Sequence, residues 1–224
     1  MDRWQMGPEE IERRSMEIIE EELLSRGELP PAENLAVVKR VIHTTADFDY
    51  RENLVFSPGA VAAGVEALRA GAWIVTDTNM ALAGVSKAAL EKLGGRGLCF
   101  MADPAAARLA RERGETRAAV SMELAAGLDT GGAPLVFAIG NAPTALARLY
   151  RLMEEGRVSP ALVIGVPVGF VNVVESKELF LGSSRPHIIA RGRKGGSTVA
   201  AAICNALLYQ AAGRAQSWGR EEKP

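Results

Sequence analysis

The sequence contains few of the residues that build disulfide frameworks and metal centres. Its 224 residues include two cysteines and two histidines. Cys99 and Cys204 stand far apart in the chain, so neither a disulfide framework nor a CxxC motif is present. So few histidines and cysteines do not form the ligand pattern of a zinc site. We therefore expect no metal site, and the cysteine usage predicts a reducing, cytoplasmic environment.

The sequence also lacks an excess of charge and a long hydrophobic segment. With 26 basic and 27 acidic residues the formal net charge is −1, whereas nucleic-acid-binding domains are usually basic. An uncharged run spans the 17 residues 158–174, but prolines and glycines interrupt it, which is typical of a buried strand followed by a loop. Residues 1–28 contain nine acidic residues and four arginines, the opposite of a signal peptide. We expect neither a nucleic-acid partner nor a membrane partner.

What the sequence does contain is 48% hydrophobic residues, arranged as short β-branched runs that alternate with amphipathic helical patterns. This alternation predicts an α/β fold, in which a mostly parallel sheet has helices on both faces. We interpret the chain as one domain, 1–224, with a helical N-terminal segment at 1–50, an α/β core at 51–213 and a C-terminal tail at 214–224. Strands are expected at 73–75, 98–101, 135–139, 162–164 and 188–190, and helices at 8–24, from 32 to about 43, at 57–71, at 86–95, from 103, from 141 to about 155, near 173–181 and from 195 onward.

The first expected helix, residues 8–24, has an apolar and an acidic side. Ile11, Ile18 and Ile19 are predicted to lie on one apolar face. The glutamates at 20–22 are interpreted as a solvated face.

A glycine-rich basic loop follows the last expected strand. In open α/β sheets, ligands bind beyond the carboxyl ends of the strands, and residues 191–198 (RGRKGGST) lie there, directly before the last helix. Glycines allow the backbone to approach a ligand closely, and a helix N-terminus favours an anion. Arg191, Arg193 and Lys194 add positive charge, and residues 179–220 contain six basic side chains and no acidic one. The loop predicts a ligand with phosphates or carboxylates, although an ordinary solvated turn that caps a helix has the same pattern. Its spacing matches neither the P-loop nor the dinucleotide-binding motif.

His43 is the second candidate for chemistry. It lies near the end of an expected helix, and a helix C-terminus favours the charged imidazolium. That suits a group that donates a proton near neutral pH. The alternative is a histidine that caps the helix or fills the core. His187, at the start of a strand, is interpreted as structural, and neither Ser57 nor Ser197 has the G-x-S-x-G setting of a hydrolase nucleophile.

Several segments of the sequence occur together in one known family. They are IHT at 42–44, FSP at 56–58, DTNM at 77–80, GNAPTA at 140–145, GVPVGFV at 165–171 with ESK at 175–177, and RGRKGGS at 191–197. With these segments the chain resembles, from residue 14 to residue 207, the precorrin-8X methylmutase family, also called precorrin isomerases. The DTNM segment and Val173-Val174 resemble most the family members that handle a cobalt-containing substrate.

The resemblance implies a fold, a reaction and an assembly. The fold would be a three-layer α/β/α sandwich with a mostly parallel central sheet and an N-terminal helical extension. The protein would move a methyl group from C-11 to C-12 of a corrinoid, giving hydrogenobyrinate or cobyrinate in cobalamin biosynthesis, by a [1,5]-sigmatropic shift. It would need no cofactor, because any cobalt arrives inside the substrate. It would be a homodimer in which each active site is completed across the subunit interface.

The resemblance also assigns roles to single residues. The catalytic histidine of the family falls on His43, which would donate a proton to the macrocycle. Ser15 matches the family's N-terminal Arg-Ser, although Met16 stands where an aromatic residue is common. Arg117 matches an arginine placed near the substrate. The remaining expected substrate-binding residues are Thr78, Asn79, Gly169, Arg191, Arg193, Lys194, Gly195, Gly196 and Ser197.

Two other functions remain open on the sequence. A non-catalytic carrier would use the same basic cleft to bind and pass on a corrinoid. A nucleotide-dependent α/β enzyme would use residues 191–198 as a phosphate loop, against which the glycine spacing argues.

Overall fold

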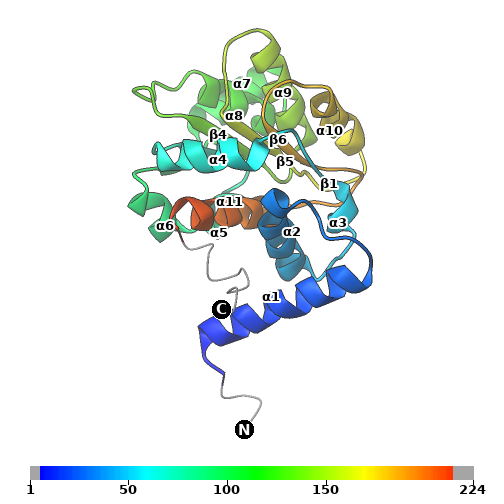
Figure 1. Ribbon diagram of the computed structural model, residues 1–224. Coiled ribbons are helices and arrows are strands. Elements are labelled where there is room, and N and C mark those ends of the chain that lie inside the picture. The colour runs from blue at the N-terminus through cyan, green and yellow to red at the C-terminus, as the bar shows by residue number, and fades with distance from the viewer. Residues whose placement is uncertain (1–5, 214–224) are drawn as a thin grey trace.

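The computed structural model describes residues 6–213, and the expected tail at 214–224 lies outside the described residues. Its centre is a six-stranded sheet with the order β1-β6-β5-β4-β2-β3 (Figure 1). β1 pairs with β6 in antiparallel orientation, and every other pairing is parallel, as expected from the alternation of strands and helices. The strands are β1 (Leu54–Phe56), β2 (Trp73–Thr76), β3 (Arg96–Cys99), β4 (Leu135–Ile139), β5 (Leu162–Gly165) and β6 (His187–Ala190).

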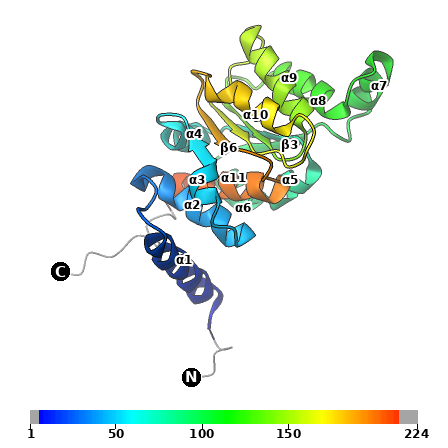
Figure 2. The same ribbon diagram turned by 90° about the vertical axis from the view of Figure 1, so that its right-hand side faces the viewer.

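Helices cover both faces of the sheet, which confirms the three-layer α/β/α arrangement (Figures 1 and 2). One layer contains α2 (Ala32–Thr45), α4 (Ala60–Arg69), α5 (Asn79–Gly84), α6 (Lys87–Lys92) and α11 (Ser197–Ala211). The opposite layer contains α8 (Arg117–Ala126), α9 (Pro143–Glu154) and α10 (Val173–Leu181), with α7 (Pro104–Arg113) packed against α8. The short α3 (Tyr50–Asn53) leads into β1, and α1 (Pro8–Ser25) lies outside the layers.

The strands supply both cores because successive side chains point to opposite faces. In β4, Val136 and Ala138 join the core under α11, whereas Phe137 and Ile139 join the core under α8 and α9. Such strands are apolar on both faces, which explains why their sequences are continuous hydrophobic runs.

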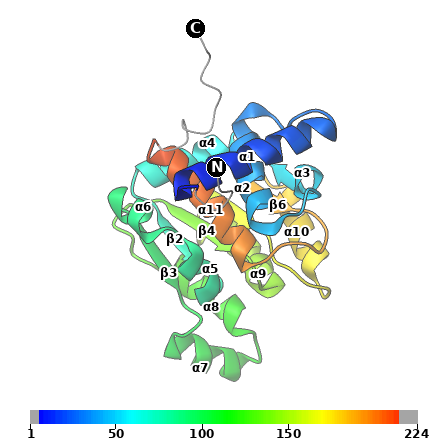
Figure 3. The ribbon, with the colours of Figure 1, turned by 90° about the horizontal axis from the view of Figure 1, so that it is seen from below.

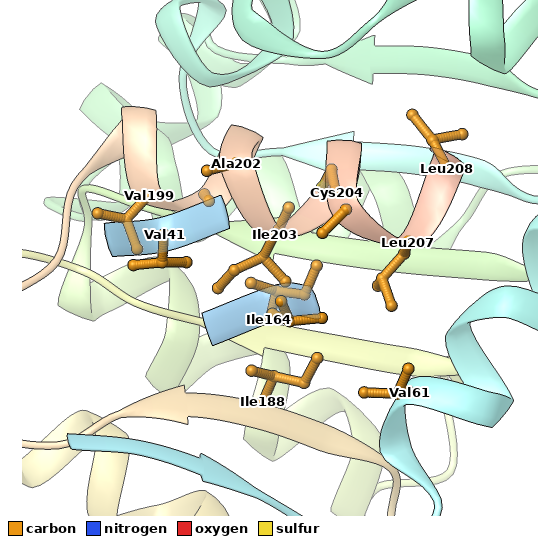
Figure 4. Close-up of a cluster of buried hydrophobic side chains, with 14 of the residues drawn as sticks. Val41, Val61, Ile164, Ile188, Val199, Ala202, Ile203, Cys204, Leu207 and Leu208 are labelled. Carbon is orange, nitrogen blue, oxygen red and sulfur yellow. The ribbon is translucent and has the colours of Figure 1, made fainter. Parts of the chain in front are cut away.

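α11 is buried nearly all round, since it packs between the sheet on one side and α2 and α4 on others. Figure 4 shows its side chains Ile203 and Leu207 facing Ile164 of β5, and Val41 of α2 beside them. Its many alanines allow this close approach of helices. The glycine-rich loop is therefore attached to a helix that is mostly buried.

α1 is the expected helical extension, and its apolar face is only partly buried. Met16, Ile19 and Leu23 are buried, whereas Ile11 and Ile18 are 55% and 46% exposed. Ile11, Ile18 and Ile19 line one groove, as expected for a shared apolar face, but only Ile19 of the three is buried. The helix lies beside α2 (Figure 3).

The acidic side of α1 is only partly solvated, contrary to expectation. Glu20 accepts a 2.6 Å hydrogen bond from the buried Lys39 of α2, and Glu12 accepts one of 2.7 Å from Arg40. These ion pairs fasten the helix to the body of the protein.

Other differences from the sequence-based expectations are local. β3 spans Arg96–Cys99 rather than the expected 98–101, because it pairs with β2 from Trp73 opposite Arg96 to Thr76 opposite Cys99. The short α3, α5 and the edge strand β1 were not expected, since short elements carry little periodic signal. The ten-residue α8 was not expected either. Within residues 6–213, no helix has the length and apolarity needed to cross a membrane.

Candidate active site

One buried side chain, Asp77, holds the loop that follows β4 at the C-terminal edge of the parallel strands. Asp77 directly follows β2. It is fully buried and accepts backbone N–H donations from Gly140 (2.8 Å), Asn141 (2.8 Å) and Ala142 (2.6 Å). Burial raises the pKa of Asp77 above its ordinary value, and the three N–H donors oppose this shift. Asp77 therefore shapes the loop after β4, a role that sequence reasoning missed, although an acid directly after a buried strand is a readable signal.

The loop after β4 touches the glycine-rich loop through backbone atoms. A Cβ on Gly140 would lie 2.7 Å from the Cα of Ser197, and one on Gly195 would lie 2.1 Å from the carbonyl oxygen of Val166. Gly196 donates its N–H to that same oxygen at 2.9 Å. Gly140 and Gly195 are required for this close packing, and the hydrogen bond of Gly196 to Val166 holds the backbone just before α11.

Thr78 and Ser197, two of the expected site residues, lie in contact with each other. Their hydroxyl groups are hydrogen-bonded to each other at 2.8 Å, and Thr78 also caps α5 by accepting the N–H of Ala81. Asn79 is the first residue of α5 and follows Thr78 directly, and contact of these residues with a substrate stays a prediction. The N-termini of α5 and α11 thus meet at one edge of the sheet.

The basic residues of the loop have different partners. The ammonium of Lys194 lies 2.6 Å from carboxylate oxygens of both Asp47 and Asp49, which raises its pKa. The guanidinium of Arg193 lies 5.4 Å from the ring centroid of Phe170. Arg191 is exposed, and its side chain has no hydrogen-bond or ion-pair partner among residues 6–213. Arg191 and Arg193 are therefore the loop cations best placed to receive an anion.

Next to the basic loop, the segment after β5 exposes apolar side chains. Phe170 and Val171 are 82% and 75% exposed, and Gly169 donates its N–H to the carbonyl oxygen of Arg193. The loop cations therefore border an apolar surface, which suits a ligand that is both apolar and anionic.

His43 lies exposed at the side of an apolar groove between α1 and α2. The groove has a volume of about 410 Å³. Ser15 of α1 is hydrogen-bonded to Nδ1 of His43 at 2.8 Å, which leaves Nε2 available to a ligand. Sequence reasoning named both residues, but only the packing of α1 on α2 brings them together. The groove is lined by Met6, Ile11, Arg14, Ser15, Ile18, Ile19, Glu22, Ile42, His43, Ala46 and Phe48.

The pKa of His43 differs in direction from the sequence-based expectation. Loss of hydration lowers it below its ordinary value, the positive charge of Arg40 lowers it further, and Glu12 opposes the shift. The favourable effect of the helix C-terminus on the imidazolium is therefore outweighed in the protein without ligand.

Arg117 is the first residue of α8, in the helical layer opposite α1 and α2 (Figure 3). Its neighbour Thr116 is hydrogen-bonded to Thr144 at the start of α9. The Arg117 side chain is exposed, and in the described part of the chain its guanidinium has no hydrogen-bond or ion-pair partner. It is a cation at the same edge of the sheet as the loops, but it belongs to another layer than His43.

The second histidine and the buried Lys177 have structural surroundings. His187 is buried, its Nδ1 lies 2.9 Å from the carbonyl oxygen of Arg185, and its ring contacts Phe180 edge-on. Lys177 donates to the carbonyl oxygens of Gly192 and Lys194 at 2.7 and 2.8 Å. Sequence reasoning did not name Lys177 as a site residue. No group of three or more potential metal ligands occurs among residues 6–213.

Comparisons with known proteins give a consistent result. The family model described as precorrin-8X methylmutase matches residues 10–210. The cobalt-precorrin-8 methylmutase of Priestia megaterium is 44% identical over 89% of this chain and 87% of its own length. The precorrin-8X methylmutase of Pseudomonas aeruginosa is 43% identical over 89% of this chain and 94% of its own. A crystal structure of precorrin-8X methylmutase from Thermus thermophilus superposes with a TM-score of 0.80 at 37% identity, covering 91% of this chain and 98% of that one.

Proposed function

Because this chain belongs to the precorrin-8X methylmutase family, we propose that it is an isomerase that acts on precorrin-8X or cobalt-precorrin-8 in cobalamin biosynthesis. The methyl group on C-11 of the macrocycle moves to C-12, and the product is hydrogenobyrinate or cobyrinate. The observation that supports this most is the exposed His43, hydrogen-bonded to Ser15 on an apolar groove.

The substrate is a large apolar ring with a fringe of acetate and propionate carboxylates. The apolar groove beside His43 and the exposed Phe170 and Val171 provide surface for the ring. Arg191, Arg193 and the N-terminus of α11 provide positive charge for the carboxylates. Thr78, Asn79 and Ser197 lie at the N-termini of α5 and α11, and Gly169 donates its N–H to the carbonyl oxygen of Arg193. We propose that these four residues contact the substrate.

The chemistry requires one proton donor and no organic cofactor or resident metal. His43 donates a proton to the conjugated macrocycle, which makes the ring poorer in electrons and favours migration of the methyl group. The C–CH3 bond to C-11 breaks as the bond to C-12 forms, and the rearranged ring returns the proton, so nothing is consumed. Ser15 orients the imidazole through Nδ1. General acid catalysis contributes about 10²–10⁴ in rate, and correct placement of the ring contributes the rest.

Incubation of the purified protein with each substrate tests the proposal. We expect the visible spectrum of precorrin-8X, of cobalt-precorrin-8 or of both to change to that of the product, with many turnovers per protein when substrate is in excess. A carrier would bind the corrinoid and leave its spectrum that of the substrate at any excess. Tight binding without turnover of either substrate would refute the isomerase and support the carrier.

We also propose that the chain acts as a homodimer in which Arg117 of one subunit serves the site of the other. Arg117 lies in another layer than His43 and has a free guanidinium among the described residues. We expect sedimentation of a species of twice the 23.8 kDa chain mass. A 1:1 mixture of His43→Ala and Arg117→Ala chains should then recover part of the activity that each lacks. A monomer at micromolar concentration in the presence of product would contradict this.

A further inference from the structure

Lys177 is an unusual residue because its long charged side chain is 1% exposed. Burial lowers its pKa to about 8, since an ammonium loses its hydration there. Its partners are two main-chain carbonyls of one loop, those of Gly192 and Lys194, at 2.7 and 2.8 Å. The buried ammonium group of Lys177 therefore fixes the backbone of the glycine-rich loop at two carbonyl groups.

Lys194, which belongs to the same loop, connects the loop to the turn after α2. Its ammonium reaches Asp47 and Asp49, both at 2.6 Å. Asp49 donates its N–H to Asp47, and Asp47 donates its N–H to the hydroxyl of Thr45, the last residue of α2. The two aspartates thus belong to the turn that directly follows the helix end on which His43 lies.

We infer that Lys177 and Lys194 form a two-lysine clamp that fixes the glycine-rich loop relative to the turn after His43, so that both lysines are positioning residues for the methyl shift. The inference rests on the proposed function, and it changes the expected role of Lys194. A substrate carboxylate would have to compete with two aspartates for this ammonium, and their negative charges repel it. The clamp instead holds the carboxylate-binding loop and the proton donor at a fixed separation.

Placement of this kind affects turnover more than affinity. If the loop moves relative to His43, bound substrate no longer presents the correct ring atom to the donor, and displacements of about 1 Å can cost as much as 10²-fold in rate. The arginines of the loop still attract the carboxylates, so binding persists. The clamp therefore predicts a loss in kcat with little change in KM.

The decisive variants are Lys194→Met and the double variant Asp47→Asn with Asp49→Asn. We expect each to lower kcat by about 10-fold with KM within about twofold, and the triple variant to be no worse than either, because all remove one interaction. Lys194→Arg should recover most of kcat. If Lys194 instead bound substrate, Lys194→Met would raise KM, and freeing it by the double variant would lower KM at unchanged kcat. Either result would overturn the clamp.

Hydrogen exchange without substrate tests the clamp independently of activity. Amides at 191–196 should exchange at least about 10-fold faster in the double variant and in Lys177→Gln, which retains one donor in case Lys177→Met does not fold. Lys87→Met, an exposed lysine of α6, is the matched control and should leave exchange in this loop unchanged. Unchanged exchange at 191–196 in the double variant would refute the clamp. Failure of the wild type to convert substrate would refute the proposed function alone.

Discussion

Replacing His43 with asparagine is expected to lower kcat by about 10²–10⁴-fold, the usual contribution of a general acid. Asparagine can still interact with Ser15 but cannot exchange a proton near neutral pH. Substrate affinity should change little, because the groove and the cations remain. The measurement is single-turnover conversion followed by the visible spectrum, together with corrinoid binding.

The other histidine provides the control for this variant. His187→Gln removes a buried imidazole that does not line the α1–α2 groove, so it should lower thermal stability and leave kcat within about twofold. A His43→Asn protein with wild-type turnover would exclude His43 as the proton donor.

The pH dependence gives a second measure of the same group. Loss of hydration and Arg40 lower the pKa of His43 below its ordinary 6.5 in the free protein, so the acid form disappears as pH rises through this lowered value. The profile of kcat/KM reports the free enzyme and should therefore fall in that range. Bound substrate carboxylates favour the imidazolium, so kcat should persist to higher pH than kcat/KM. A fall of both at the same pH would contradict this coupling.

Asp77→Asn is expected to lower the free energy of unfolding by about 2–4 kcal/mol. The carboxylate accepts three backbone N–H groups at a fully buried position. An amide has one acceptor oxygen, and its NH2 group would face at least one of these donors. The loss should appear as a lower midpoint in urea unfolding, with the m-value unchanged.

The matched control for this variant is Asp129→Asn. Asp129 is an exposed aspartate that accepts one backbone N–H, from Gly131 at 3.0 Å. Since water replaces a lost partner there, we expect a change within about 0.5 kcal/mol. Equal stability of Asp77→Asn and the wild type would show that the three N–H donations to Asp77 do not stabilise the loop after β4.

Much of the α/β core follows from local patterns. The runs at 135–139 and 162–164 are apolar throughout because both faces of these strands are covered, and the structure places strands there. The helix from Val173 to Leu181 and the glycine-initiated α11 were also expected. The edge strand β1 was not, because three residues carry no recognisable period.

The face of α1 shows where local pattern fails. Its isoleucines lie along one groove, and only the partner helix decides which apolar residues of α1 become buried. α2 covers Met16, Ile19 and Leu23, and it leaves Ile11 and Ile18 along the groove of His43.

The sequence by itself determined the class of fold and the glycine-rich basic loop, because both depend on residues that are neighbours in the chain. The choice of His43 as proton donor came from the family resemblance and stays a prediction. Only the tertiary structure decided which charged side chains have an ion-pair partner and which have none among the described residues. Lys194 meets Asp47 across 147 residues of sequence, and Ser15 meets His43 across 28. Such contacts depend on how the helical layers bring separate loops to one edge of the sheet, and no local period encodes that. The same packing lowers the pKa of His43, since hydration is lost where α1 lies on α2.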